Sequence, residues 1–411
     1  MKILIVTQYF WPENFKINDL AVDLVEKGHD VTVLTSIPNY PKGSFFDGYG
    51  LLKKRKESYF GVKVIRSWII PRGNGKTIKI IYNYVSALVF SSLAIIFKVR
   101  GSFDVQFVFA NSPLTVALPA IFKKKLKKIP IVLWLQDIWP ESVYAMVNLN
   151  SKITRNFIDK ISMYIYNKSD VILAQSLGYE ALLEKKGISK KKIEYLPNWA
   201  DQILVDEASS KKRKSEIKRL LPRGFKIIFT GNIGEAQDFP SLLNAVELLK
   251  QKKVNIKWVI VGAGGKHEWL KLEVVKRGLD NNMFLLGSFP LADMPHFFNM
   301  ADVLYVSLKK DPAFTLTVPG KVQMYLNAGK PILSMIDGEG HKVIKSAKVG
   351  FSVSAGEFTE LAKRAEELSN MTKVQLQKLG DNALRYSQKN YNRRKILDNT
   401  EKILSRLSKN D

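Results

Sequence analysis

Two glycine-rich turns and one lysine are the residues of this sequence best suited to binding phosphate. Gly231-Asn232-Ile233-Gly234 and Gly262-Ala263-Gly264-Gly265 each follow an apolar run and precede a helical pattern. Glycine lets the backbone approach a diphosphate closely, and a helix that begins there presents its amides to the anion. Lys321 falls in the first turn of a helix predicted to begin near Gly320, where a cation is unfavourable unless an anion binds.

These turns exclude some classes of nucleotide-binding protein and leave others open. Neither turn fits GxGxxG with a following acid, which disfavours a nicotinamide dehydrogenase, and the P-loop pattern GxxxxGKS/T is absent. Glycine-rich turns between a strand and a helix are often only tight connections, and a lysine at a helix end is often only solvated. Both alternatives therefore stay open at this point.

Two further clusters place acids and aromatic rings directly after predicted strands. Trp11 and Glu13 belong to YFWPEN at 9–14, and Asp137 and Trp139 belong to QDIWPE at 136–141. Asp137 could act as an acid or base or bind sugar hydroxyls, and the two tryptophans could stack on a sugar ring. The alternative is that the tryptophans are core residues and the acids cap helices.

The elements that position these residues alternate between strand and helix. Strands are expected at Lys2–Thr7, Val31–Thr35, Val62–Ser67, Phe103–Phe109, Pro130–Leu135, Val171–Ala174 and Ile193–Leu196, and then at Lys226–Thr230, Ile256–Val261, Met283–Leu286, Asp302–Ser307 and Pro331–Met335. Such alternation predicts parallel sheets with helices on both faces, which bind ligands at the carboxyl ends of the strands. A basic stretch at 197–224 interrupts it. We therefore predict an α/β fold of two Rossmann-like domains facing a central cleft.

Composition narrows the class of protein further. The 411 residues include no cysteine and four histidines far apart, so a disulfide, a thiolate site and a histidine metal site are all disfavoured. The formal charge of +26 favours anionic partners, namely nucleic acid, a phospholipid surface or phosphorylated substrates. The first residues form too short an apolar run for a signal peptide, and we expect a cytoplasmic protein.

One uncharged segment, residues 80–97, is long enough to concern a membrane. Strands are predicted on both sides of it, so a span would divide one sheet between two faces of a bilayer, which disfavours crossing. A buried core helix and a helix that lies on the membrane surface both remain open. Basic clusters at 53–56, 123–128 and 190–192 favour an anionic surface.

Eight motifs, in this order, resemble one family. They are YFWPENFKINDLA at 9–21, GHDVTVLT at 28–35, IPNYPKG at 37–43, LQDIWPES at 135–142, LPNWAD at 196–201, TGNIGEAQDF at 230–239, VGAGG at 261–265 and VPGKVQMYLNAGKPIL at 318–333. With them the chain resembles the bacterial retaining glycosyltransferases of the GT-B fold, family 4, that make O-antigens and capsules, and in particular the N-acetyl-L-fucosamine transferases.

The resemblance implies a domain plan and a site. It implies an acceptor-binding domain at 1–200, a nucleotide-sugar-binding domain at 201–385, and a last helix at 386–411 that crosses back to the first domain. It assigns catalysis to Asp137, Lys321 and Glu13, without a metal or other cofactor. It assigns donor binding to Gly231, Asn232, Gly234, Gly262, Phe289, Pro290, Thr317, Val318, Pro319 and Gln323.

The function implied is transfer of a sugar, of the N-acetyl-fucosamine type, from a UDP-sugar to an undecaprenyl-diphosphate-linked saccharide. The enzyme would lie on the inner face of the plasma membrane. The sequence departs from the family at its usual glutamate pair, because Leu316 and Met324 stand there, and Glu235 stands where a basic residue is usual. Gln323 is the nearest polar candidate for the ribose, and an inactive relative is the alternative.

Two other functions compete with this interpretation. A UDP-N-acetylglucosamine 2-epimerase shares the architecture, but its chemistry needs carboxylates and a histidine around the sugar, and no such cluster is visible in the sequence. A basic protein that binds nucleic acid fits the charge, but no nucleic-acid motif appears and aromatic residues do not interleave with the basic ones.

Overall fold

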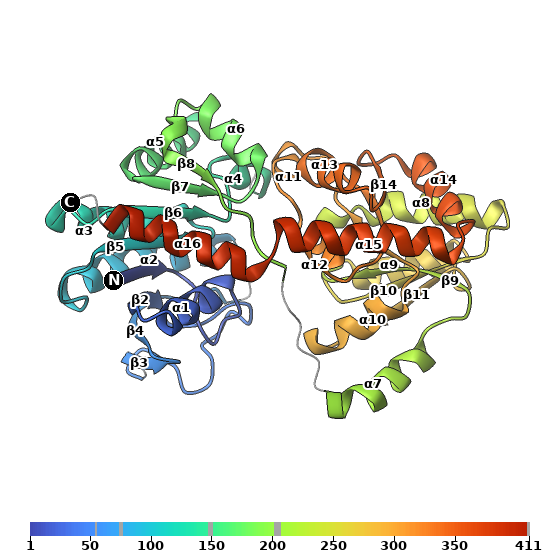
Figure 1. The fold of residues 1–411 in the computed structure, drawn as a ribbon, viewed down its shortest axis with the longest axis horizontal. Coiled ribbons are helices and arrows are strands. Elements are labelled where there is room, and N and C mark those ends of the chain that lie inside the picture. Colours follow the sequence, from blue (N-terminus) through green and yellow to red (C-terminus); the bar gives the residue numbers. More distant parts are fainter. Residues whose placement is uncertain (54–55, 74–76, 147–150, 201–206, 409–411) are drawn as a thin grey trace. The chain divides into compact units, whose positions relative to one another are not determined.

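The computed structural model describes residues 1–53, 56–73, 77–146, 151–200 and 207–408 (Figure 1). The chain forms two compact units. Unit 1 comprises Met1–Pro197 with Arg394–Asp411, and unit 2 comprises Asn198–Arg393. The boundaries predicted from the sequence fall at residues 200 and 385.

Unit 1 is built on an eight-stranded sheet in the order β3-β4-β2-β1-β5-β6-β7-β8. All neighbouring strands are parallel except β3 and β4, which form an antiparallel pair. The central strands are almost wholly apolar and buried, as expected where helices cover both faces of a sheet. The strands are β1 Lys2–Thr7, β2 Asp30–Ser36, β3 Lys56–Tyr59, β4 Val62–Ser67, β5 Val105–Ala110, β6 Ile131–Leu135, β7 Val171–Ala174 and β8 Ile193–Tyr195.

The helices of unit 1 follow the strands in sequence, and the last helix of the chain joins them. Ion pairs connect α16 to the start of the chain, because Asp398 binds Lys27 (2.7 Å) and Glu401 binds His29 (3.0 Å). The helices are α1 Lys16–Glu26, α2 Thr77–Phe97, η1 Leu114–Val116, α3 Ala117–Lys127, α4 Glu141–Met146, α5 Lys152–Lys168, α6 Leu177–Lys185, η2 Lys190–Lys192 and α16 Arg393–Ser408.

Unit 2 is built on a six-stranded sheet in the order β11-β10-β9-β12-β13-β14, and every pair in it is parallel. The strand order reverses between β9 and β12, which is where a sheet of this kind binds its ligand. The strands are β9 Phe225–Thr230, β10 Ile256–Val261, β11 Met283–Gly287, β12 Val303–Ser307, β13 Ile332–Met335 and β14 Gly350–Val353.

Two apolar clusters fill the two faces of the second sheet. Helices α8, α9 and α14 contribute to one cluster, and α10, α12, α13 and α15 contribute to the other. The helices are α7 Glu207–Leu220, η3 Glu235–Gln237, α8 Phe239–Gln251, α9 His267–Lys276, η4 Leu291–Asp293, α10 Met294–Met300, α11 Pro312–Thr315, α12 Gly320–Asn327, α13 Gly338–Ala347, α14 Phe358–Ser369 and α15 Lys373–Asn390.

The prediction of two Rossmann-like parallel sheets is confirmed, and the differences lie at edges and connections. The antiparallel strand β3 and the edge strand β14 were not predicted. Residues 386–390 belong to α15, which lies in unit 2, so the helix predicted to begin at 386 is in fact α16 and begins at Arg393. The break between the two helices falls at Tyr391-Asn392, where the sequence carries no proline or glycine.

Candidate functional site

In unit 2, the two glycine turns pack backbone against backbone. An added Cβ at Gly262 would lie 1.8 Å from the carbonyl oxygen of Gly231, and one at Gly264 would lie 2.3 Å from that of Ile233. The Gly231 amide donates to Val261 (2.8 Å), and the Gly262 amide donates to Gly287 (2.8 Å). The ends of β9, β10 and β11 are thereby held together, and only glycine fits at their contacts.

Lys321 lies directly over the first of these turns. A Cβ at Gly231 would lie 2.6 Å from Cε of Lys321, and the lysine Nζ lies 4.1 Å from the centre of the Phe229 ring. Burial lowers the pKa of Lys321 to about 8. Within the described part of the chain, no carboxylate forms an ion pair with it, and no side chain caps α12 at Pro319. A desolvated ammonium beside uncapped helix amides is a favourable place for a diphosphate.

The structure places the other predicted donor residues around the same strand ends. Asn232 lies beside both Gly234 and Gly264, since Cβ atoms added there would meet its side-chain amide at 2.5 Å. Phe289 follows β11 and packs against Phe297 (4.8 Å between ring centres), while the neighbouring Pro290 is exposed.

The side chains of residues 317–319, just before α12, differ from one another in solvent exposure. Thr317 and Pro319 are half-buried, whereas the side chain of Val318 belongs to the core. Gln323 is buried and makes no hydrogen bond within the described residues. Their roles in donor binding stay predictions.

The positions of the usual glutamate pair are filled by apolar packing. Met324 packs against the core cluster of unit 2, and Leu316 is half-buried. Glu235 forms an ion pair with Lys266 (2.7 Å), which comes from the turn after β10. A cation therefore does lie beside the first glycine turn, but it comes from a different strand, which is why the local motif did not reveal it.

In unit 1, Asp137 lies at the end of β6 and binds the neighbouring strand end. Its Oδ2 accepts a hydrogen bond from the Ser112 amide (2.9 Å), and the Ser112 hydroxyl accepts one from the indole of Trp139 (3.2 Å). Asp137 and Trp139 are both half-buried. Both are thus fixed by Ser112 with part of their surface still open, while Trp11 is exposed and stacks on Tyr59 (4.9 Å).

Two residues that sequence reasoning missed, Arg72 and Tyr84, form a polar group with Tyr9 of the YFWPEN cluster. Arg72 follows β4, donates to the Tyr9 hydroxyl (3.4 Å) and lies 5.8 Å from the centre of the Tyr84 ring. Burial raises the pKa of Tyr84, Arg72 opposes the rise, and the charge of Asp137 adds to it. Tyr9, Arg72 and Tyr84 therefore lie together, although they come from the segment after β1, the segment after β4 and α2, and the charge of Asp137 reaches Tyr84. Such a group of a cation, phenols and a carboxylate suits a polar, anionic acceptor.

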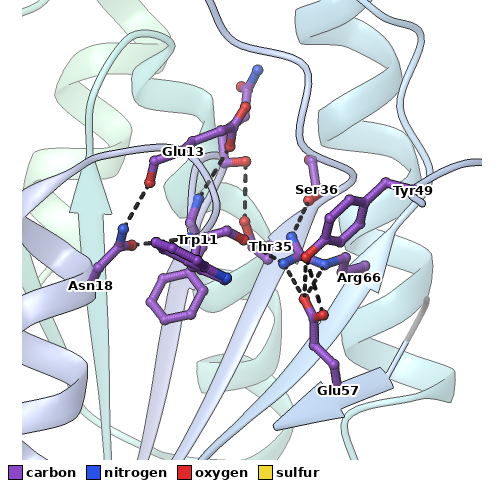
Figure 2. Close-up of polar contacts among 10 residues, drawn as sticks. Trp11, Glu13, Asn18, Thr35, Ser36, Tyr49, Glu57 and Arg66 are labelled. Atoms are coloured by element: carbon purple, nitrogen blue, oxygen red, sulfur yellow. Dashed lines mark hydrogen bonds and ion pairs between the residues drawn. The ribbon is translucent and has the colours of Figure 1, made fainter. Parts of the chain in front are cut away.

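Glu13 is buried and binds backbone rather than an open surface (Figure 2). Its Oε1 accepts hydrogen bonds from the amides of Asn39 (2.9 Å) and Tyr40 (2.8 Å), and its Oε2 accepts one from Phe10 (3.3 Å). Burial raises the pKa of Glu13 to about 7, although these three bonds act in the opposite direction. The carboxylate thus joins the loops after β1 and β2, and its predicted contact with the acceptor stays a prediction.

A buried arginine also holds the loops after β1 and β2 in place (Figure 2). Arg66, in β4, is fully buried and donates through Nε to Glu57 (2.7 Å) and through Nη1 to the carbonyl of Ser36 (3.1 Å). Its Nη2 donates to the carbonyl of Trp11 and to Glu57. The signal in the sequence was a basic residue at a buried position of a strand, in VKVIRS.

We predict that Glu13→Gln, which keeps an acceptor for the Asn39 and Tyr40 amides and loses only the longer bond from Phe10, is destabilised less than Glu13→Ala, which loses about 1–3 kcal/mol because all three buried amides lose their acceptor. The Glu13 pKa is raised on folding, so wild-type stability should fall as pH rises from 4.5 to 7. Glutamine cannot ionise, so this pH dependence should vanish in Glu13→Gln. Urea unfolding at several pH values measures both effects. A large loss of turnover with unchanged stability in Glu13→Gln would instead mark a catalytic carboxylate.

Among the described residues, no group of three or more histidine, aspartate or glutamate side chains could hold a metal ion. Lys321 and Lys266 are two cations beside the candidate donor site.

Comparison with solved structures defines the fold class. The chain superimposes on HepE from Anabaena, solved in complex with UDP-glucose, with a TM-score of 0.67 and 14% identity over 99% of this chain and 100% of that one. The two Rossmann-like units are those of a GT-B glycosyltransferase. Residues 15–199 match the family described as "Glycosyl transferase 4-like domain", and residues 210–386 match "Glycosyl transferases group 1". The chain therefore belongs to the group 1, GT4-type glycosyltransferases.

Two curated relatives agree with this family. The chain is 26% identical to "Probable glycosyltransferase WbjE" of Pseudomonas aeruginosa over 58% of this chain and 60% of that protein. It is 25% identical to "Putative colanic acid biosynthesis glycosyl transferase WcaI" of Escherichia coli K12 over 80% and 82%. The first match thus spans about three-fifths of the relative's length.

Proposed function

We propose that this protein transfers a sugar from a UDP-sugar to a lipid-linked saccharide during synthesis of a bacterial surface polysaccharide. The observation that carries the proposal is Lys321, a buried lysine without a carboxylate partner in the described residues, held over Gly231 at the start of an uncapped helix. The similar structures of HepE were solved in complex with UDP and with UDP-glucose, which supports a UDP-linked donor.

In the proposed reaction the bond between the sugar C1 and the diphosphate oxygen breaks, and an acceptor hydroxyl forms the new bond to C1. Lys321 and the amides of α12 would stabilise the charge that develops on the departing diphosphate. The acceptor proton would pass to a diphosphate oxygen on the same face of the sugar, so configuration is retained without a protein nucleophile. Asp238, after β9, and Asp311, after β12, cap helices, and Glu235 is paired with Lys266, which is consistent with this scheme.

For the acceptor side, we propose an undecaprenyl-diphosphate saccharide that binds near Asp137, Arg72 and Tyr84. The relative named for colanic acid biosynthesis supports a role in polysaccharide synthesis. The resemblance of the motifs supports an amino sugar of the N-acetyl-fucosamine type as the donor sugar. The enzyme would work in the cytoplasm, on the inner face of the plasma membrane.

A thermal-shift screen against UDP, GDP, TDP and their sugars tests the proposal. A ligand at a hundredfold excess over its dissociation constant adds about 2.7 kcal/mol to the stability of the folded state. We expect UDP and at least one UDP-sugar to raise the melting temperature. The proposal fails if none of these ligands shifts the transition.

UDP affinity is expected to weaken as pH rises above 8. The pKa of Lys321 in the free protein is about 8, and a bound diphosphate would raise it. The dissociation constant should then increase by up to about tenfold per pH unit above 8, until the pKa of the complex is reached. Calorimetric titrations at pH 7, 8 and 9 measure this. Lys321→Arg is the control, since arginine stays charged and its affinity should be nearly independent of pH. A wild-type affinity that is flat from pH 7 to 9 would contradict the role of Lys321.

A further inference from the structure

Helix α2 has the reverse of the usual polarity of a helix on a protein surface. The side chains that it buries are Asn83, Ser86, Ala87, Ala94 and Ile95. The large side chains that it exposes are Ile78, Ile81, Tyr82, Val85, Val89, Leu93, Ile96 and Phe97. A helix on a water-exposed surface normally buries its apolar stripe, so the outward face of α2 is suited to an apolar medium.

The buried face of α2 is fixed by polar contacts within unit 1. Asn83 donates to the carbonyl of Ile70 (2.6 Å) and accepts a hydrogen bond from Gln8 (2.9 Å). The Ser86 hydroxyl accepts a hydrogen bond from the Ile70 amide (2.9 Å). These buried bonds fix the rotation of α2 about its own axis, because any other rotation would break them.

The helix lies on a surface and does not cross a bilayer in this fold. Among the described residues, α2 is the one helix long and apolar enough to span a membrane. The strands before and after it, β4 and β5, belong to the same sheet. A span would place these two strands on opposite sides of the hydrocarbon core, where unpaired backbone is too costly. The sequence left open whether residues 80–97 form a buried core helix or a helix on a surface. Only about a quarter of the apolar part of α2 is buried, so α2 is not a core helix.

The surroundings of α2 are strongly basic. Between residues 77 and 136 the sequence has eight basic residues and one acidic residue. Five of the eight are lysines at 123–128, on or just after the neighbouring helix α3, whose Phe122 and Leu126 are exposed. Lys127 and Lys128 form no ion pair within the described part of the chain.

A pocket of about 490 Å³ joins the two helices. Ile96 of α2 lines it together with Phe122 and Leu126 of α3, so the exposed apolar side chains of both helices meet there. Lys123 also lines it, although this side chain is only 6% exposed. Its Nζ donates to the carbonyl of Val99 (3.0 Å), and no carboxylate in the described residues pairs with it. A buried cation in an apolar pocket matches a phosphate attached to a hydrocarbon chain.

We propose that the outward face of α2, with the lysines of α3 at its edge, binds the surface of a bilayer that contains anionic phospholipid. This face, defined by Ile81, Val85, Val89 and Leu93 of α2 and by Lys125, Lys127 and Lys128, is called the lipid face below. Its side chains would enter the boundary between headgroups and acyl chains, and its lysines would attract lipid phosphates. The inference extends the proposed function, because it names the surface that would bring the enzyme to a lipid-linked acceptor.

Flotation of the full chain with vesicles tests the lipid face. One set of vesicles is phosphatidylcholine alone, and the other contains about 30 mol% phosphatidylglycerol. We expect binding to the anionic vesicles that weakens with salt, and at least about tenfold weaker binding to the neutral ones. Lys125→Glu/Lys127→Glu should lower the partition coefficient for anionic vesicles at least about tenfold. Val85→Glu/Val89→Glu should lower it as much, and since both side chains are already exposed the fold should persist.

The matched control is Lys271→Glu/Lys345→Glu, which makes the same change of charge at exposed lysines of unit 2. It should bind anionic vesicles like the wild type. If the control loses as much binding as Lys125→Glu/Lys127→Glu, net charge alone explains the binding and the inference is overturned. If the wild type ignores anionic vesicles at low salt, the inference is also wrong.

Two further measurements separate this inference from its rivals. The first is the oligomeric state, measured by sedimentation. If the wild type is a dimer and Val85→Glu/Val89→Glu is a monomer, the outward face of α2 joins two copies of the chain and the inference is overturned. The UDP thermal shift, measured on the same preparations, is independent of vesicle binding. If the lipid face does not bind membrane, the UDP thermal shift is still observed. If the proposed function is wrong, the UDP shift is absent and the protein still floats with anionic vesicles.

Discussion

Lys321→Met is expected to abolish UDP binding and, at the same time, to raise the melting temperature of the ligand-free protein. A pKa lowered to about 8 by burial means that the charged lysine costs about 3 kcal/mol relative to water. Methionine fills a similar volume without this cost. The free energy of unfolding of unit 2 should therefore increase by up to that amount, which raises the melting temperature by several degrees. The variant should also lose at least about a hundredfold in turnover, because a preorganised cation no longer meets the departing diphosphate. Differential scanning calorimetry and a coupled assay for UDP release measure the two effects.

The pH dependence of the stability difference is the control for this explanation. Unfolded lysine keeps its proton up to about pH 10.5, whereas folded Lys321 loses it near 8, so the cost of burial is fully present below pH 8. The advantage of Lys321→Met should therefore shrink as pH rises from 8 towards 10.5. A variant that is less stable than the wild type at pH 7 would show that Lys321 is a structural residue.

The local structure of the candidate donor site was largely predictable, because its signals are local in sequence. The turns at Gly231 and Gly262 and the helix that begins at Gly320 each lie within a few residues, and their chemistry depends on backbone conformation that those residues determine. What the local pattern missed was the pairing of Glu235 with Lys266, because the two residues come from different strands.

The candidate acceptor site was less predictable, because it is assembled from distant segments. The sequence predicted that Glu13 faces the acceptor or the sugar, and it did not predict that its carboxylate binds amides 26 and 27 residues further along the chain. Arg72 and Tyr84 lie outside every motif that was singled out, and only the folded unit 1 brings them to Tyr9 and brings Tyr84 within reach of the charge of Asp137. Such contacts depend on which strand neighbours which, and the sequence does not encode that order locally.

Composition alone also left the nature of residues 80–97 open, for a physical reason. An uncharged helix can be buried by protein or by lipid, and its mean composition is the same in both cases. The information lies in which side chains face inward, and here the polar Asn83 and Ser86 do so. Their inward direction is fixed by partners such as Gln8 and Ile70, which belong to other elements.

Gly262→Ala is expected to destabilise unit 2 by about 3 kcal/mol or more and to abolish UDP binding. The new Cβ would lie 1.8 Å from the carbonyl oxygen of Gly231, and the φ of +152° at this position is one that alanine rarely adopts. The carbonyl cannot retreat freely, because the Gly231 amide is bonded to Val261 and continues the pairing of β9 with β10. Both the overlap and the strained backbone therefore cost free energy. Urea unfolding and UDP titration measure the two losses.

Gly265→Ala is the matched control, three residues along the same turn. A Cβ there meets no atom within 4 Å, and the backbone is not in the left-handed region. We expect its free energy of unfolding to stay within about 0.5 kcal/mol of the wild type. If Gly265→Ala nevertheless weakens UDP binding, glycine at 265 is needed so that the ligand can approach the backbone. Glycine at 262 is needed for a different reason, because the end of another strand packs against it. A Gly262→Ala protein as stable as the wild type would contradict the backbone contact on which the whole donor site is built.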